Sequence, residues 1–153
     1  MRLADQLIVS LARWNTVCTL SEQVDYRDWL AACYPHWQFV DDFSALRVET
    51  VDEMGTNMLS KSGLDYLCWF TPEGVMNTPH EFSTEGLLMI GSSPCGDPLV
   101  IDTLGATGLE LGFVAHEKLW EDSLPPRKAF QPWPDTLLTF LECIWSQPDY
   151  VTY

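Results

Sequence analysis

Hydrophobic positions along the chain follow a helical period near its two ends and form short apolar runs in between. Apolar residues three or four positions apart predict an amphipathic helix over residues 2–14. A second helix is predicted from Ser21, whose hydroxyl can act as the N-cap, to about residue 34, just before a proline. The same period predicts a last helix over residues 135–147, with Asp135 as its cap.

The central region carries short apolar runs bounded by Gly, Pro, Ser and Asp, the residues that make turns. Three of these runs predict the strands of an antiparallel meander, over residues 87–91, 98–103 and 110–117. Two more strands are predicted over residues 46–51 and 65–71, the second of them almost continuously apolar and therefore covered on both faces.

The segments between these elements are predicted to be irregular. Residues 39–43 suit a loop or an edge strand, and residues 52–63 suit a loop or a short helix. Residues 72–86 and 120–134 are rich in Pro, Gly and polar side chains and are predicted to be loops. The order helix, helix, strands, helix predicts an α+β fold with one antiparallel or mixed sheet flanked by helices. A chain of 153 residues is most simply one domain, residues 1–153.

Charge is distributed unevenly along this chain. Twenty-two Asp and Glu residues face eight Lys and Arg residues, for a net charge of −14, and no cationic side chain lies between Lys61 and Lys118. Nucleic acid and anionic membranes both require cationic surfaces, so neither is expected as a partner. Such a surface either serves solubility alone or attracts a basic protein. The carboxylate-rich segments give these candidate partner contacts: Asp41, Asp42, Asp52, Glu53, Asp97, Glu117, Trp120, Glu121 and Asp122.

Two tryptophans stand in polar or proline-rich surroundings. Trp120 is followed by Glu121 and Asp122, and Trp133 lies between two prolines. An aromatic side chain rimmed by carboxylates suits recognition of a basic protein. The alternative is that both tryptophans pack in the core under the proline-rich segment, as most tryptophans do.

The five cysteines are odd in number and none has C-x-x-C spacing, which favours reduced thiols over a disulfide framework. No signal peptide and no apolar run of about 18 residues is present in the sequence. These features predict a cytoplasmic protein.

One pair of residues could support catalysis. Cys95 lies in a turn after one strand and His116 at the end of a later one, with Asp102 or Glu117 available to orient the imidazole. A thiol nucleophile needs such a base and such an orienting group. The spacing is generic, however, and a catalytic cysteine more often begins a helix, so no catalytic site is predicted.

Metal and cofactor motifs are not found in the sequence. The three histidines are far apart, His116-Glu117 does not continue into H-E-x-x-H, and the glycines fit neither a phosphate-binding nor a dinucleotide-binding loop. We therefore expect no metal and no cofactor.

The central region resembles the SUKH superfamily. The resemblance covers residues 82–145 and consists of an ordered series of elements: a strand, a Gly-Asp turn, a strand ending in Ile-Asp, a strand with Gly-x-Val and His-Glu, and a late amphipathic helix. The matching positions are Ile90-Gly91, Gly96-Asp97, Ile101-Asp102, Gly112, Val114, His116-Glu117 and Phe140-Leu141.

This resemblance implies an α+β fold and a role without enzymatic activity. Many bacterial members of the superfamily are similar to immunity proteins that bind and neutralise a toxin, often a nuclease or a deaminase. A basic toxin of that kind would be attracted by the charge of −14, with carboxylates occupying the sites of substrate phosphates. A regulatory adaptor without a toxin partner would have the same features.

Overall fold

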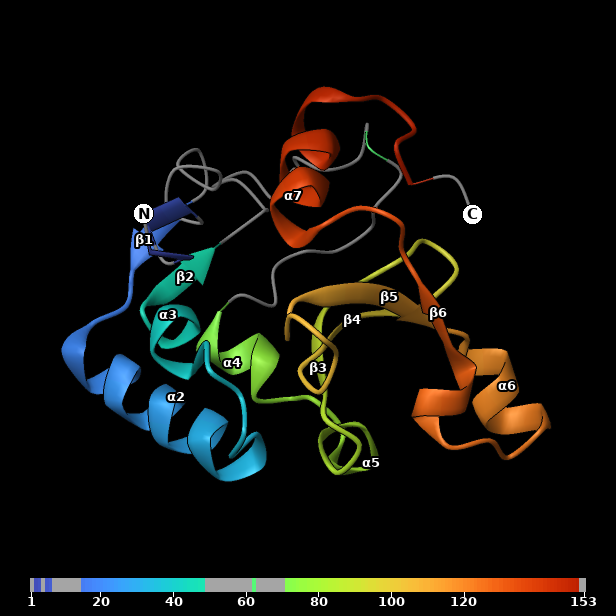
Figure 1. Cartoon of the computed structure of the whole chain (residues 1–153), viewed down its shortest axis with the longest axis horizontal. Helices are drawn as coiled ribbons and strands as arrows, with labels where there is room; N and C mark the ends of the chain where they lie inside the picture. The colour runs from blue at the N-terminus through green and yellow to red at the C-terminus, as the bar shows by residue number, and fades with distance from the viewer. Residues whose placement is uncertain (1, 4, 7–14, 49–61, 63–70, 152–153) are drawn as a thin grey trace.

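The computed structural model of the protein describes residues 2–3, 5–6, 15–48, 62 and 71–151, and every structural statement below concerns these residues (Figure 1). The predicted strand at 65–71 lies outside them except for residue 71, which is not in a strand. The predicted loop or helix at 52–63 lies outside them except for Ser62, and the predicted helix at 2–14 is described only at four positions.

A four-stranded antiparallel sheet forms the centre of the structure, in the order β3-β4-β5-β6. Its strands are β3 (Leu87–Ser92), β4 (Pro98–Asp102), β5 (Glu110–Val114) and β6 (Phe130–Pro132). The predicted α+β fold with a helix-flanked antiparallel sheet is confirmed, and the three central strands form the predicted meander.

Strand β6 corrects the prediction that residues 120–134 are wholly irregular. It pairs with β5 at the edge of the sheet, where a proline can be accommodated because one side of the strand forms no ladder. The pairing continues past the strand, since the Trp133 N–H donates to the Leu111 carbonyl at 2.8 Å.

Side chains alternate between the two faces of the sheet, and each face has its own hydrophobic cluster. One face packs against the helices α2 (Leu20–Cys33), α3 (Val40–Ser44) and α7 (Leu137–Ser146). The sheet residues on this face are Leu88, Ile90, Leu99, Ile101, Leu111 and Phe113. The other face packs against α5 (His80–Ser83), α6 (His116–Glu121) and the 3₁₀ helix η3 (Pro126–Ala129). The sheet residues on this second face are Leu87, Met89, Val100 and Val114. Helices therefore cover both faces.

The helices on the first face begin where side chains can cap them. Helix α2 (Leu20–Cys33) begins after Thr19 rather than at Ser21, because Thr19 and Glu22 form a reciprocal capping box. Helix α7 (Leu137–Ser146) begins after Thr136, whose hydroxyl accepts from the Thr139 N–H at 3.3 Å, and not at Asp135.

A short helix replaces the predicted loop or edge strand at residues 39–43. Helix α3 (Val40–Ser44) has Asp41 and Asp42 in its first turn, where negative charge stabilises a helix, and it buries Phe43 completely.

The N-terminal part of the chain forms a separate ribbon of two strands. Strand β2 (Leu46–Val48) confirms the start of the strand predicted at 46–51, and residues 49–51 lie outside the described part of the chain. It pairs with β1 (Asn15–Val17), a strand that the sequence pattern did not predict and that directly follows the predicted helix at 2–14.

Two single-turn helices occupy the predicted loop at residues 72–86. These are α4 (Pro72–Val75), capped by the Thr71 hydroxyl, and α5 (His80–Ser83). The segment covers the outer edge of β3, because Thr78 Oγ1 accepts from the Met89 N–H at 3.2 Å. An edge covered in this way is protected from pairing with another chain.

Helix α6 (His116–Glu121) follows β5 directly and corrects the predicted strand end, since β5 stops at Val114. A 3₁₀ helix, η3 (Pro126–Ala129), then leads into β6. Figure 1 shows α6 at one end of the long axis of the molecule, with α2 and α3 at the opposite end.

Gly112 is where β5 and β6 approach too closely for a side chain. A Cβ atom there would lie 2.4 Å from both the Gln131 carbonyl oxygen and the Phe130 ring. We expect Gly112→Ala to lower the free energy of unfolding by about 2 kcal/mol or more, because backbone would have to move. Urea denaturation measures this.

Gly96→Ala is the matched control. Gly96 has a φ of 89°, but the nearest atom to an added Cβ lies 3.8 Å away, so only the backbone conformation is disfavoured. We expect it to cost about 1 kcal/mol. Equal stability of Gly112→Ala and the wild type would contradict the close approach of β6 to β5.

Candidate functional site

The turn between β3 and β4 directs one carboxylate into the protein. The Ser93 N–H donates to the Asp97 carbonyl at 2.9 Å, and the Asp97 N–H donates to the Ser93 hydroxyl at 3.2 Å. Gly96 supplies the positive φ that this tight turn requires. As a result Asp97 is only 8% exposed.

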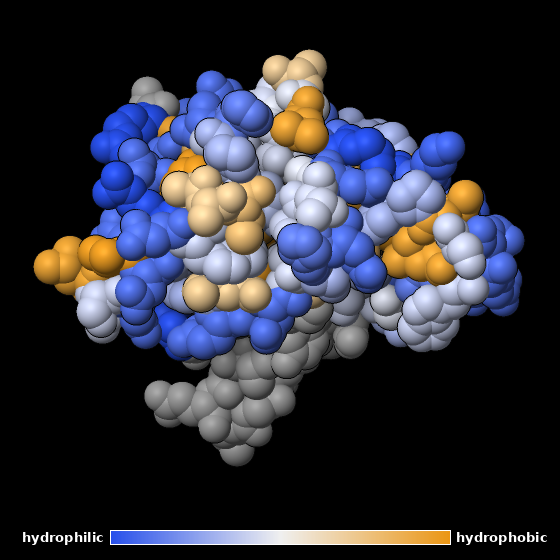
Figure 2. Space-filling model, turned by 90° about the horizontal axis from the view of Figure 1, so that it is seen from below, coloured by the Kyte–Doolittle hydropathy of each residue, from blue (hydrophilic) through white to orange (hydrophobic). Residues whose placement is uncertain are grey.

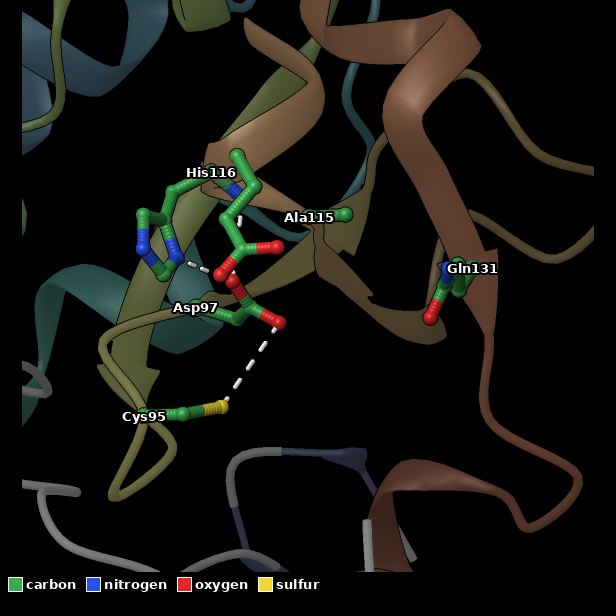
Figure 3. A pocket seen from close by; sticks show the side chains of 6 residues that line it. Cys95, Asp97, Ala115, His116 and Gln131 are labelled. Carbon is green, nitrogen blue, oxygen red and sulfur yellow. Dashed lines mark hydrogen bonds and ion pairs between the residues drawn. The ribbon is translucent and has the colours of Figure 1, made fainter. Parts of the chain in front are cut away.

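The Asp97 carboxylate binds the first residue of α6 (Figure 3). Its Oδ1 accepts from the His116 N–H at 2.9 Å and also hydrogen-bonds the His116 ring at Nδ1. The N-cap residue of α6 is Ala115, which has no side-chain acceptor. Asp97 therefore caps the helix from a distant turn, as a carboxylate near a helix N-terminus does favourably.

His116 in turn contacts Trp120 one turn later on the same helix. The two rings meet edge to face, with centroids 5.4 Å apart and planes at 79°. Trp120 is nevertheless 79% exposed, so the alternative that it packs in the core is wrong. Trp133 does pack in the core, against Phe113, Phe140 and Tyr150.

A groove of about 590 Å³ lies beside Trp120, between α5 and the connection from α6 to η3. Figure 2 shows a small apolar patch among hydrophilic surface at this end of the molecule. The groove is lined by Glu81, Thr84, Glu85, Leu119, Trp120, Ser123, Leu124, Pro125 and Pro126.

Arg127 fixes the walls of this groove relative to each other. Its guanidinium donates to both Asp102 carboxylate oxygens at 2.9 Å and to the Glu85 carbonyl at 2.5 Å. Its N–H donates to the Glu85 carboxylate at 2.6 Å. The hydrogen bonds to Asp102 raise the pKa of the guanidinium, so this cation stays charged and paired within the protein.

Carboxylates outnumber cations five to three in residues 80–85 and 116–128, and one of the three cations is the paired Arg127. The carboxylates are Glu81, Glu85, Glu117, Glu121 and Asp122. This end of the molecule therefore combines an exposed indole, a groove and an excess of negative charge.

The structure brings together four of the nine predicted contact residues, namely Glu117, Trp120, Glu121 and Asp122, all exposed on or directly after α6. Asp41 and Asp42 lie at the opposite end (Figure 1), where Asp41 pairs with Arg27 at 3.0 Å and Asp42 with Arg2 at 3.8 Å. Asp97 is buried, and its carboxylate is used within the protein. Asp52 and Glu53 lie outside the described residues.

Sequence reasoning missed the opposite wall of the groove. Glu81 and Glu85 lie in the long segment between Lys61 and Lys118 and are not among the predicted contact residues. Their spacing of four residues is the one signal that could have placed them on one side of a helical turn. Nothing in the sequence indicates that this turn faces α6.

Cys95 and His116 do line one pocket, of about 300 Å³, together with Asp97, Ala115, Glu117 and Gln131 (Figure 3). The Cys95 thiol contacts Asp97 Oδ2 at 3.8 Å and the Ser93 hydroxyl at 3.1 Å. Asp97, and not Asp102 or Glu117, is the carboxylate that holds the imidazole. Asp102 binds Arg127 instead.

The order of these groups differs from that of a nucleophilic triad. In a triad the histidine lies between the nucleophile and the carboxylate, so that the imidazole can take the proton. Here the carboxylate lies between the thiol and the imidazole, and the second ring nitrogen of His116 points away from Cys95 (Figure 3).

Two further cysteines lie elsewhere in the fold. Burial raises the pKa of the Cys18 and Cys33 thiols, which keeps both protonated.

In the part of the chain that the structure describes, no group of three or more His, Cys, Asp or Glu side chains could hold a metal ion. No helix within those residues has both the length and the apolar character needed to cross a bilayer. Comparison with models of known protein families, with curated proteins and with solved structures finds no match.

We expect Asp97→Ala to lower the free energy of unfolding by about 2 kcal/mol, because α6 loses its cap and the His116 ring its partner. Exchange of the His116 amide hydrogen should also become faster, since its acceptor is gone. Both effects are measured by urea denaturation and by hydrogen exchange followed with NMR.

Asp122→Asn, on an exposed carboxylate at the other end of α6, should change stability by less than about 0.5 kcal/mol. If Asp97→Ala were equally harmless, Asp97 would not be what holds the helix.

Proposed function

We propose that this protein is a non-enzymatic, cytoplasmic protein-binding module of the SUKH type. It acts as a bacterial immunity protein that neutralises a basic toxin of the nuclease or deaminase kind. The observation that carries the proposal is the exposed Trp120, 79% accessible, held by His116 and Asp97 and accompanied by three carboxylates of the same helical segment.

An indole in this position is well suited to anchor a partner. Tryptophan is enriched among the residues that contribute most to binding, and exposing one to water without a partner is unfavourable. Its contact with His116, which Asp97 fixes in turn, lowers the conformational freedom that Trp120 would lose on binding. Anchors that are already positioned bind more tightly for the same contact area.

The charge of the protein supports a basic partner. A net charge of −14 accelerates the encounter with a positively charged surface, and the carboxylates near Trp120 orient it. Toxins that act on nucleic acid need cationic active sites, which these carboxylates would occupy. A regulatory adaptor with a basic partner would use the same surface, and neutralisation of a toxin distinguishes the two roles.

We expect Trp120→Ala to weaken binding to the toxin encoded beside this protein by about 30-fold or more, the loss typical of a central anchor. Protection of cells that express the toxin should decrease in parallel. Isothermal titration calorimetry and a co-expression survival assay measure the two effects, and an unchanged melting temperature establishes that the variant is folded.

Raising the salt concentration should weaken the same complex steeply, because exposed charges are screened within about 8 Å at physiological ionic strength. Asp28→Asn on α2, at the end of the molecule opposite α6, removes one negative charge far from Trp120 and should leave affinity within about twofold. Failure to protect cells from any basic toxin would contradict the immunity role.

Cys95→Ala tests the alternative of a thiol enzyme that uses Cys95 and His116. We expect this variant to bind and neutralise the toxin as well as the wild type does, because the thiol's hydrogen-bond partners, Ser93 and Asp97, both lie in its own turn. Loss of protection with retained toxin binding would favour the enzymatic alternative instead.

A further inference from the structure

The groove beside Trp120 has the composition of a site for a basic peptide segment. Its lining combines apolar surface from Leu119, Leu124 and two prolines with the carboxylates of Glu81 and Glu85. Its volume of about 590 Å³ lies within the range of ligand-binding pockets, roughly 300–1,000 Å³.

We propose that this groove receives an arginine-containing segment of the partner, an inference that rests on the function proposed above. The arginine guanidinium stacks on the Trp120 indole and pairs with the Glu81 carboxylate across the groove, and neighbouring apolar side chains of the segment cover Leu119 and Leu124. The partner is therefore recognised by the pairing of arginine with apolar residues, beyond its overall positive charge.

Arginine fits this arrangement better than lysine. Its planar guanidinium can stack on an indole and donate two parallel hydrogen bonds to a carboxylate at the same time, whereas an ammonium is a compact and strongly hydrated charge. Trp120 and Glu81 line the same groove from different helices, and the guanidinium is proposed to lie between them.

The walls of the groove are fixed before a partner binds. Arg127 joins η3 to α5 through Glu85 and to the sheet through Asp102. Pro125 and Pro126 restrict the backbone of the connecting segment. A groove with fixed walls loses little conformational entropy when a flexible segment enters it.

The negative charge of the groove disfavours other kinds of ligand. A nucleic acid strand or an acidic peptide would bring its own negative charge against Glu81 and Glu85. An uncharged apolar ligand would desolvate the Glu81 carboxylate without offering it a hydrogen-bond donor. A segment with cationic and apolar residues satisfies both kinds of surface.

The experiment uses two synthetic peptides, Ac-Gly-Leu-Arg-Leu-Arg-Leu-Gly-NH₂ and the same sequence with lysine in place of arginine. Binding to the full-length protein labelled with 5-fluorotryptophan is followed by ¹⁹F NMR, and Trp120→Phe assigns the Trp120 signal. We expect the arginine peptide to shift the Trp120 signal and to bind about fivefold more tightly than the lysine peptide, from the stronger stacking of guanidinium.

Glu81→Gln should weaken binding of the arginine peptide by about fivefold or more, and Asp28→Asn should leave it within about twofold. Both replace one exposed carboxylate with its neutral isostere, so they alter net charge equally. Equal loss in the two variants would show attraction by overall charge alone and would overturn the groove site.

Other outcomes would also overturn the inference. These are the absence of peptide binding at low salt, binding that leaves the Trp120 signal unmoved, or equal affinity for the two peptides. The proposed function is tested separately, because toxin neutralisation that survives Glu81→Gln but fails in Trp120→Ala would keep the immunity role and reject the groove. Peptide binding with no neutralisation of any toxin would keep the groove site and reject the immunity role.

Discussion

The buried carboxylate of Asp97 is the interaction on which this end of the molecule depends. A charge that is 8% exposed must be compensated by hydrogen bonds, and His116 supplies two of them through its backbone and its ring. Because Ala115 cannot cap α6, the helix obtains its cap from a turn 19 residues earlier in the chain. The β3–β4 hairpin, the start of α6 and the position of Trp120 are thereby fixed by one side chain.

A second constraint is the close pairing of β5 with β6, which positions the segment that follows α6. Gly112 lets β6 approach β5, and η3, which leads directly into β6, is thereby held beside the sheet. From there Arg127 reaches Asp102 at the end of β4 and Glu85 after α5. Helix α6 is thus held at its first residue by Asp97, and the segment after it is held by Arg127. Residues 119–126, which include the groove-lining part of α6 and of the segment after it, lie between these two attachments in the chain, which explains how so short a helix can present an exposed indole in a defined position.

Local patterns in the sequence predicted the long elements and missed the short ones. The meander strands are short apolar runs with turn residues between them, and α7 is long enough to show an apolar stripe. Helix α2 was located from a capping hydroxyl near its start and a proline after its end. Helices of four to six residues, such as α5 and α6, contain at most two turns, so no period can be read from them. The caps of α2 and α7 were misplaced by one or two residues because neighbouring Thr, Ser and Asp side chains are all capable acceptors. Only the backbone geometry selects among them.

The site depends on contacts between distant residues, which local patterns do not reveal. Trp120 and Trp133 looked equivalent in sequence, yet one is exposed while the other packs against Phe113 and Phe140. Cys95, Asp97 and His116 show a related difference, since the residues of a possible triad do meet but in an order that places the carboxylate beside the thiol. Asp97 accepts hydrogen bonds from the backbone and ring of His116, and a carboxylate used in this way serves to position α6. The Asp97 and His116 side chains that could support catalysis hold the first residue of α6, and their role follows from these contacts more than from their residue types.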